Sequence, residues 1–417
     1  IQKNHDNDIN DINDISNNND ICIIEVGGTI GDIEGLPFIE AIRQFKYKTN
    51  SINKFCFIHV GLIPIIGNEP KTKPMQNSIK QLRNNGINPD IICSRCKVSL
   101  SDSIKDKLSL FCQVPKEYII ENKDVNTIYD VPIMFRNQKM VDIIMKKLDL
   151  TTKISLEENI FNQMSEFFNT KENKMKICIV GKYVKADDAY ISLYRALEQS
   201  SFTINTPIDM IWIDSEILDL KTNEDLKTCS GIIIPGGFGE RGIEGMLKVI
   251  EYARINNIPL LGICLGMQLM VVEFARNVLK INAHSEEFIK PNEKYDKVII
   301  NMPDIDKNNM GGTMRLGEKE TYIENNTYAY SIYKKNKIFE RHRHRYEVNP
   351  KYISLFEENK LIFSGKNNDK TRMEIVEYNT NNFYIGWQYH PEYISKIGNS
   401  HVLFDEFLRK STEFIPL

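Results

Sequence analysis

The sequence lacks several features that would place it in a specialised class of protein. No segment approaches the roughly 18 to 20 consecutive apolar residues that a membrane helix needs. The formal net charge is only −3, so no whole-molecule attraction to nucleic acid or to an anionic membrane is expected. Short-period internal repeats are also missing, which excludes a solenoid. We therefore expect neither a nucleic-acid partner nor a membrane partner.

Cysteine is sparse for a chain of this length, with eight scattered residues in 417. A chain this long does not need disulfides to stabilise its fold, so a reduced, intracellular and cytoplasmic setting is expected. Cys93 and Cys96 form a single CxxC pair with no second pair nearby. Zinc or redox chemistry is one interpretation, and two cysteines at the end of a strand are the alternative that we favour.

Composition is otherwise that of a globular enzyme, with 41% hydrophobic and 26% charged residues. The length allows two domains, each with its own core. The exception is residues 1–20, which are almost wholly Asn, Asp and Ile. Such a low-complexity segment cannot bury enough surface to offset its ordering entropy, so we expect it to be disordered. The first residue is not Met, and we interpret the chain as a fragment that begins inside an insertion.

Strand-like and helix-like segments alternate from residue 21 to about 150. Apolar, β-branched runs at 21–26, 54–66 and 90–94 predict buried parallel strands. Residues 34–47 and 75–86 have helical spacing, and Asn84-Asn85-Gly86 supplies a helix stop. Residues 151–173 are predicted to form a helical connector and a polar linker.

A second alternation occupies residues 174–417. Strands are predicted at 175–183, 207–215, 231–234 and 259–264, with helices at 189–202, 244–257 and 266–279. Strands alternating with helices at this spacing favour a parallel, doubly wound sheet. The predicted fold is therefore α/β with two doubly wound domains, at 21–150 and 174–417.

Cys264 stands where an apolar run ends and a helix is expected to begin, in the sequence PLLGICLGMQLM. Gly262 and Gly266 allow close backbone approach at a sharp turn, and a helix N-terminus stabilises negative charge on sulfur. This is the sulfur counterpart of a hydrolase nucleophile elbow. A buried structural cysteine is the alternative, and this motif alone does not decide between the two.

Two further motifs favour the nucleophile. In IGWQYHPEY, His390 and Glu392 follow a strand-like run and can face the same way on an extended chain. Glu392 can then fix the imidazole while His390 activates the thiol. The glycine-rich turn 235–239 ends the preceding strand, where backbone N–H groups can point at an oxyanion.

The motifs PGGFG, GICLGMQ and HPEY together resemble the class I glutamine amidotransferase family, triad type. The resemblance implies a glutaminase in which Cys264 attacks the side-chain amide, His390 transfers the proton and Glu392 orients His390. It implies oxyanion stabilisation by the backbone of Gly237 and Leu265. The glutamine-binding residues that it implies are Gly237, Leu265, Gly266, Met267, Gln268, Glu287 and Arg345, with Arg343 as a weaker candidate.

Longer blocks resemble the CTP synthase family, namely EVGGTIGDIEGLPFIEAIRQ, KTKPMQNSIKQL, GGTMRLG and ERHRHRYEVNP. The resemblance implies ATP-dependent amination of UTP with ammonia from glutamine, in pyrimidine nucleotide synthesis. It assigns residues 21–150 to part of a P-loop-NTPase-like synthase domain. It also implies Mg²⁺, activation by GTP, feedback inhibition by CTP, and a homotetramer that can form filaments.

The same resemblance assigns nucleotide sites to residues whose chemistry suits them. Glu25, expected at a strand end, would be a carboxylate ligand of Mg²⁺. In 71–76, lysines and a hydroxyl can bind a triphosphate while proline stiffens the loop. The UTP/CTP residues are Asp32, Ile33, Glu34, Lys71, Thr72, Lys73, Pro74, Met75, Gln76 and Lys107, with Arg95 as a weaker match; those for ATP are Lys123, Asp124 and Val125.

The run 341–345 alternates arginine and histidine, which composition alone would connect with nucleic acid or metal. In an extended segment the arginines lie on one side and the histidines on the other. We therefore expect no metal here.

One family feature is missing from this sequence. The resemblance calls for a glycine-rich, P-loop-like segment for the ATP phosphates, and no Gly-x-x-x-x-Gly-Lys-Ser/Thr pattern occurs here. We expect the isolated chain to make no CTP from UTP, ATP and ammonia. Two alternatives remain: a glutaminase that serves another nucleotide synthase, and a structural or filament-forming protein without activity. The blocks at 25–35 and 71–76 argue against the first, and the retained Cys264, His390 and Glu392 argue against the second.

Overall fold

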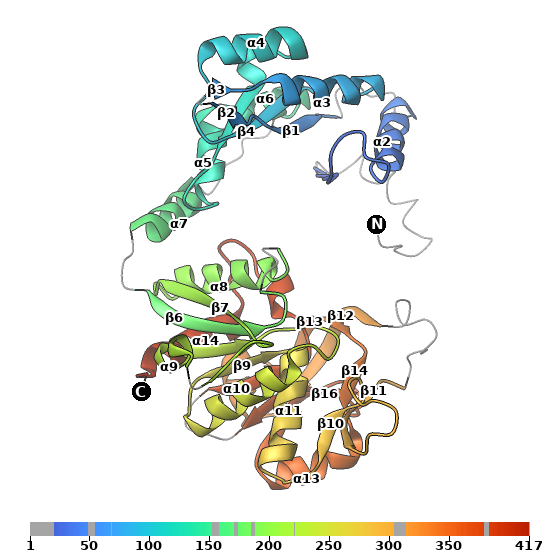
Figure 1. Cartoon of the computed structure of the whole chain (residues 1–417), viewed down its shortest axis with the longest axis vertical. Coiled ribbons are helices and arrows are strands. Elements are labelled where there is room, and N and C mark those ends of the chain that lie inside the picture. The colour runs from blue at the N-terminus through green and yellow to red at the C-terminus, as the bar shows by residue number, and fades with distance from the viewer. Residues whose placement is uncertain are drawn as a thin grey trace. The chain divides into compact units, whose positions relative to one another are not determined.

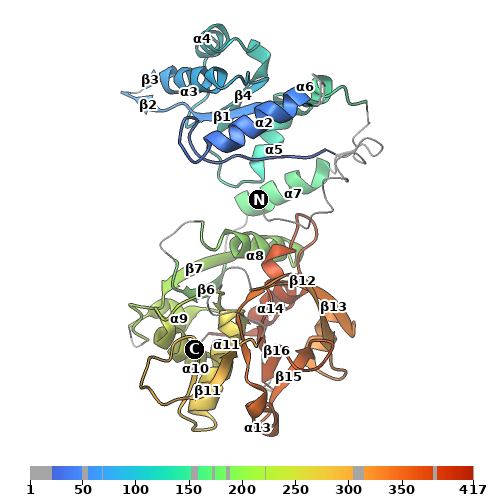
Figure 2. The same cartoon turned by 90° about the vertical axis from the view of Figure 1, so that its right-hand side faces the viewer.

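The structure is a computed structural model of the chain that describes residues 21–48, 55–67, 69–151, 158–170, 174–184, 188–220, 222–303, 314–378 and 383–416. Expectations for residues 1–20, for the first part of GGTMRLG and for parts of the 151–173 connector lie outside these residues. The chain divides into two compact units, 1–169 and 170–417. Both are mixed α/β (Figures 1 and 2). The finer domain division proposed from the sequence stays a prediction.

In the described residues of the first unit, strands β1, β4 and β5 form a parallel sheet in the order β1-β4-β5. Helix α3 packs Met75, Ile79 and Leu82 into the core, a spacing that places them on one helical face. It ends at Asn84, and Gly86 follows with φ +79°, so the predicted stop is confirmed. The elements are α2 (Leu36–Lys48), β1 (Ile58–Leu62), β2 (Ile65–Ile66), β3 (Glu69–Pro70), α3 (Lys73–Asn84), β4 (Ile91–Cys96), α4 (Asp102–Cys112), η2 (Lys116–Tyr118), β5 (Ile119–Lys123), α5 (Asp130–Asn137), α6 (Met140–Lys147) and α7 (Glu158–Thr170).

Two local predictions for this unit were wrong. Residues 21–26 form no strand, and Ile23 is 90% exposed. A strand exists only when its backbone pairs with a neighbour, and within the described residues nothing pairs with this segment. The segment 71–76 is not a stiffened loop, because Thr72 is the N-cap of α3 and Pro74 lies in its first turn. Proline is compatible with that position because the first helical N–H groups have no intrahelical acceptor.

The second unit is built on a larger sheet with the strand order β13-β12-β15-β16-β17-β9-β8-β6-β7 in the described residues. Neighbouring strands pair parallel from β17 through β9, β8 and β6 to β7, and they pair antiparallel from β13 through β12, β15 and β16 to β17. The elements are β6 (Met175–Gly181), α8 (Ile191–Thr203), β7 (Ile208–Asp214), α9 (Glu224–Thr228), β8 (Gly231–Ile234), α10 (Ile243–Ile255), β9 (Leu260–Ile263), α11 (Leu265–Asn277), β10 (Ala283–Ser285), β11 (Asp296–Asn301), β12 (Arg315–Ile323), α12 (Tyr328–Tyr333), β13 (Lys337–His344), β14 (Tyr346–Val348), η3 (Pro350–Tyr352), α13 (Ile353–Glu358), β15 (Leu361–Lys366), β16 (Met373–Tyr378), β17 (Tyr384–Trp387), η4 (Pro391–Tyr393) and α14 (Val402–Glu413).

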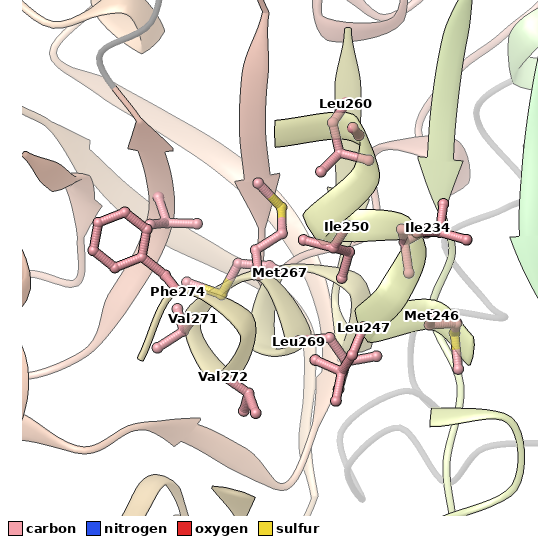
Figure 3. Packing of buried hydrophobic residues seen from close by; sticks show 14 of the residues in the cluster. Ile234, Met246, Leu247, Ile250, Leu260, Met267, Leu269, Val271, Val272 and Phe274 are labelled. Carbon is pink, nitrogen blue, oxygen red and sulfur yellow. The ribbon is translucent and has the colours of Figure 1, made fainter. Parts of the chain in front are cut away.

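Helices cover both faces of this sheet, which is why its central strands are continuously apolar. Helices α10 and α11 pack on one face, and α8 and α14 belong to the core on the other. Figure 3 shows the first of these layers, where Leu247 and Ile250 of α10 meet Met267 and Leu269 of α11. Strands β8 and β9 are buried along their whole length. The core thus fixes these strands rigidly and positions whatever follows their ends.

None of the helices found in the described residues combines the length and the apolar character that crossing a membrane requires.

Candidate active site

Four neighbouring parallel strands of the second unit carry candidate site residues just beyond their carboxyl ends. These strands are β17, β9, β8 and β6, which are adjacent in the sheet. Parallel strands end at the same edge, and ligands bind there in open α/β sheets. His390, Cys264, the turn 235–239 and Lys182 therefore meet, although up to about 200 residues separate them in the sequence.

Cys264 occupies a strained turn between β9 and α11. Its backbone has φ +52° and ψ −97°, a conformation that costs about 1–3 kcal/mol for a residue other than glycine. Its N–H donates to Trp387 O of β17 at 2.6 Å, which holds the turn against the neighbouring strand. A Cβ on Gly262 would lie 2.8 Å from the carbonyl carbon of Gly266, so the turn closes only with glycine. The structure thus has the nucleophile-elbow geometry that the sequence predicts.

His390 and Glu392 form a buried pair beside this cysteine. His390 Nδ1 lies 2.7 Å from Glu392 Oε1, and both side chains are less than a tenth exposed. Burial opposes protonation, but the negative charges of Glu392 and Cys264 raise the pKa of His390 well above its usual value. A Cβ on Gly236 would lie 2.9 Å from His390 Cε1 and 3.6 Å from Cys264 Cβ. The glycine turn therefore covers the thiol and the imidazole together.

Lys182 was missed as a functional residue by the sequence reasoning, which placed it at a strand end. It is only 3% exposed, and its Nζ donates to Phe238 O at 3.0 Å and to Gly239 O. Burial lowers its pKa to about 8, against the favourable charge of Glu287. Its place after the apolar run of β6 gave no local signal, because its burial depends on β6 lying next to β8. Lys182 holds the carbonyl side of the turn that carries Gly237.

Glu287 holds the same turn from its N–H side, accepting from Gly239 N at 2.8 Å. Burial is the largest influence and raises the pKa of Glu287 above its usual value, although the Gly239 N–H and the charges of Lys182 and Arg345 act in the opposite direction. The Arg345 guanidinium lies over the Phe238 ring at 5.3 Å. Glu287 and Arg345 are thus grouped around the glycine turn.

The residues after Cys264 face different surroundings. Met267 is fully buried in the apolar core, so its side chain points away from the site. Leu265 lies 3.5 Å from where a Cβ on Gly237 would stand, so the two residues proposed to bind the oxyanion are neighbours. Gln268 Nε2 donates to Tyr346 O at 3.1 Å.

The alternation predicted for 341–345 is confirmed in β13, whose residues alternate between exposed and buried. Arg341 and Arg343 are exposed, while His342 and His344 are buried. Burial, followed by the charge of Arg315, lowers the pKa of His344 to about 3, so both histidines are neutral near pH 7. Sequence reasoning predicted this separation but not the buried ion pair of Arg315 with Glu374, at 2.6 Å.

The triphosphate candidates of the first unit lie around the start of α3. Lys71 Nζ pairs with Glu69 Oε2 at 2.6 Å, and Gln76 Nε2 donates to Thr72 Oγ1 at 3.0 Å. Lys73 is exposed, whereas Met75 is 1% exposed and packs into the core. The side chain of Met75 therefore does not face solvent.

The loop that carries Asp32, Ile33 and Glu34 packs against the same helix. A Cβ on Gly31 would lie 3.1 Å from Gln81 Oε1 of α3, while the three loop residues are exposed. Asp32 Oδ2 accepts from Thr29 N at 3.2 Å. The two sequence blocks assigned to pyrimidine recognition thus meet at α3.

Glu25 is exposed and, contrary to prediction, is not at a strand end. Among the described residues no group of three or more His, Cys, Asp or Glu side chains is arranged to hold a metal ion. A single carboxylate still suits Mg²⁺, which keeps several waters and binds through one or two carboxylates together with phosphate oxygens.

The ATP candidates lie at the end of strand β5, whose last residue is Lys123. Lys123 Nζ lies 3.4 Å from Ser99 Oγ, and Asp124 pairs with Arg95 at 3.2 Å. Val125 is exposed beside them. Lys107 lies exposed on α4.

Both CxxC cysteines lie in a strand, as we favoured, but only Cys96 is at the strand's end, and Cys93 lies in its middle. Cys93 and Cys96 are buried in β4, and burial raises the pKa of Cys93 to about 11. All eight cysteines lie in described residues, where they are free thiols.

Comparison with known proteins agrees with this geometry. Residues 1–150 match the family model "CTP synthase N-terminus", and residues 185–410 match "Glutamine amidotransferase class-I". The CTP synthase of Staphylococcus carnosus is 42% identical over 403 residues, covering 96% of this chain and 74% of that protein. CTP synthase 1 of Saccharomyces cerevisiae is 43% identical, with 91% and 69% covered. A solved structure of the glutaminase domain of Trypanosoma brucei CTPS with bound acivicin is 35% identical, has a TM-score of 0.53, and covers 58% of this chain and 97% of its own.

The nine-stranded sheet described above and the cysteine elbow thus belong to a class I glutamine amidotransferase fold. Since both family models match and relatives more than 40% identical span nearly the whole chain, the chain belongs to the CTP synthase family.

Proposed function

We propose that this protein supplies ammonia from glutamine for the ATP-dependent amination of UTP to CTP, a step of pyrimidine nucleotide synthesis. The observation that carries the proposal is the strained, buried Cys264 beside the His390–Glu392 pair. A fold-only role needs none of these three side chains. Membership of the CTP synthase family supports the choice of acceptor.

In the proposed glutaminase reaction, His390 removes the thiol proton and the Cys264 sulfur attacks the side-chain carbonyl carbon of glutamine. The backbone N–H groups of Gly237 and Leu265 are the proposed donors to the oxyanion, where fixed donors contribute most. His390 then protonates the leaving nitrogen, and ammonia and a glutamyl thioester result. Water, deprotonated by His390, hydrolyses the thioester to glutamate and restores the thiol.

Glu392 keeps the imidazole oriented and stabilises the imidazolium that forms in each half-reaction. The raised pKa of His390 supports this role, because it shows that its surroundings favour the charged ring. Lys182 and Glu287 are proposed to hold the turn that carries Gly236 over the reacting atoms. Glutamine itself would be held by Gly237, Leu265, Gly266, Gln268, Glu287 and Arg345, and by the backbone of Met267.

For the synthase half, we propose that UTP is bound by the exposed groups at 32–34, at 71–76 and at Lys107, and ATP by those at 123–125. Lysines suit triphosphates because an ammonium gives charge-assisted hydrogen bonds to phosphate oxygens. Mg²⁺, held by Glu25, would neutralise charge between the crowded phosphates. The same family membership supports GTP activation, CTP inhibition, a homotetramer capable of forming filaments, and a cytoplasmic location.

The first test is glutamate release from glutamine by the 417-residue chain, wild type and Cys264→Ala. The wild type should release glutamate and the variant should not. In the longest natural form of the protein that carries this chain, CTP is then followed from UTP and ATP with glutamine or with ammonium. The variant should lose only the glutamine reaction; a variant that still uses glutamine contradicts the triad, and a wild type inactive with ammonium contradicts the synthase step.

A further inference from the structure

A chain of hydrogen bonds runs from a backbone carbonyl to the sulfur of Cys264. Gln268 Nε2, in the first turn of α11, lies 3.1 Å from Tyr346 O and 3.1 Å from Gln388 Oε1. Gln388 Nε2 lies 3.7 Å from Cys264 Sγ. Gln268 and Gln388 are 3% and 1% exposed, so water does not compete for these contacts.

The direction of this chain follows from its fixed end. A backbone carbonyl only accepts, so the Gln268 atom that faces Tyr346 O must be the amide nitrogen. That nitrogen can only donate, so Gln388 must present its oxygen to Gln268. The amide nitrogen of Gln388 therefore faces the sulfur, and the contact with Cys264 is a donor contact.

The sulfur of Cys264 also contacts a hydrogen-bond acceptor, a backbone carbonyl oxygen. Cys264 Sγ lies 3.8 Å from Arg343 O, which belongs to strand β13 and is held by the β12–β13 ladder. A carbonyl oxygen can accept only from the protonated thiol, so this contact favours the neutral form. The hydrogen bond from the Gln388 amide N–H to the sulfur becomes stronger when the sulfur becomes negative, because a hydrogen bond to an ionised acceptor is stronger than one to a neutral acceptor.

We propose that Gln388 is a further catalytic residue, whose amide N–H stabilises the Cys264 thiolate, and that Gln268 is the positioning residue that orients it. This inference rests on the proposed glutaminase function. The contact acts twice: the thiolate is the nucleophile when the thioester forms, and it is the leaving group when water hydrolyses the thioester. In both steps the donor lies beside the sulfur when the negative charge is on it.

The test is the rate at which iodoacetamide alkylates Cys264 between pH 6 and 9.5, without glutamine, followed by mass spectrometry of the Cys264 peptide. Gln388→Met removes the donor at similar size, and the rate at pH 7 should fall about tenfold while the pH midpoint of alkylation moves up by about one unit. The plateau rate at high pH should stay unchanged. Gln268→Met should move the midpoint in the same direction by less.

Gln199→Met is the matched control, because Gln199 is a buried glutamine of α8 that the site does not use, and its midpoint should equal that of the wild type. Gln388→Glu keeps the acceptor and the shape, and it should move the midpoint further upward, because an ionised carboxylate would face the sulfur. An unchanged midpoint in both Gln388 variants, or a lower plateau at an unchanged midpoint, overturns the proposal.

Glutamate release, measured in parallel, separates this inference from the proposed function. If the wild type releases no glutamate but the alkylation midpoint still moves in Gln388→Met, the proposed function is wrong and the stabilising contact stands. If the wild type releases glutamate and the midpoint does not move, the glutaminase stands and the role of Gln388 is wrong.

Discussion

The candidate glutamine site and the candidate nucleotide site are built in different ways. In the second unit, Cys264 and His390 are 4% and 7% exposed, and protein groups surround their reactive atoms. In the first unit, Lys73, Lys107 and Lys123 are exposed. A buried catalytic group must find its partners within the fold, because an unpaired one is costly. An exposed lysine can instead remain solvated until a phosphate arrives.

The difference predicts how each site responds to mutation. Changes in the glutamine site should alter chemistry by large factors, because they disturb an arrangement that exists before substrate binds. Changes in the nucleotide residues should weaken binding moderately, since each exposed cation contributes one contact among several.

The largest effect is expected for Cys264→Ala. Glutamate release should fall by at least about 10⁴-fold, because the variant has no nucleophile. Binding of UTP, measured by calorimetry, should match that of the wild type. Glutamate release within about a hundredfold of wild type would show that another group attacks glutamine.

Glu392→Gln should lower glutamate release by about 10²- to 10⁴-fold at pH 7.5. The amide cannot stabilise the imidazolium of His390, and it leaves the ring without its negative partner. Steady-state kinetics across pH should show the loss mainly in kcat. Activity close to wild type would remove Glu392 from the triad.

Gly236→Ala should lower glutamate release by about 10- to 100-fold, because the new methyl group would stand 2.9 Å from His390 Cε1 and displace it. Gly239→Ala is the control from the same turn: its Cβ meets nothing within 4 Å, although its φ of +81° adds backbone strain. If Gly239→Ala loses as much activity as Gly236→Ala, the effect comes from strain in the turn and not from contact with the imidazole.

The His390–Glu392 pair should make stability depend on pH. Because the folded-state pKa of His390 is raised above 6.5, its stabilisation is present in full below about pH 6.5 and is lost as the pH rises through the raised value. Each pKa unit by which the folded-state value exceeds the unfolded value contributes about 1.4 kcal/mol to the free energy of unfolding. Urea unfolding from pH 6 to 9.5 should show that the free energy of unfolding of the wild type exceeds that of Glu392→Gln, and that this difference is largest at low pH. A constant difference across this range would contradict the assignment.

The smallest effect is expected in the first unit. Lys71→Met should weaken UTP binding about five- to tenfold by removing one phosphate contact, while the free energy of unfolding changes by about 0.5 kcal/mol or less. Its ion pair with Glu69 is exposed and contributes little to stability. Lys80→Met, an exposed lysine further along α3, is the control. Equal UTP affinity in both variants would exclude Lys71 from the nucleotide site.

Much of the second unit could be predicted because its signals are local. Apolar runs that end in glycine predicted β6, β8 and β9, and the alternation in 341–345 predicted which side chains of β13 are buried. The first unit shows where local signals fail. Residues 21–26 have the composition of a strand but no pairing partner among the described residues, and strand formation depends on pairing.

Two site residues could not be found from local patterns. Lys182 reads as an ordinary strand end, and its burial under the turn 235–239 depends on β6 lying next to β8. Gln388 precedes the His390 motif without any signal of its own. Its role depends on Gln268, 120 residues away, and on a carbonyl of β14.

The sequence by itself determined the kinds of residue available for chemistry and their places at strand ends: a thiol between glycines, a histidine with a carboxylate two positions on, and lysines near a helix start. Only the tertiary structure decided which of them meet. Strand β17 lies beside β9, so His390 reaches Cys264. The same strand order brings two further groups to the sulfur: the Gln388 amide N–H, which favours the thiolate, and Arg343 O, which favours the neutral thiol. The physical reason is that side-chain chemistry is local, whereas burial and hydrogen-bond direction depend on neighbours that only strand order brings together.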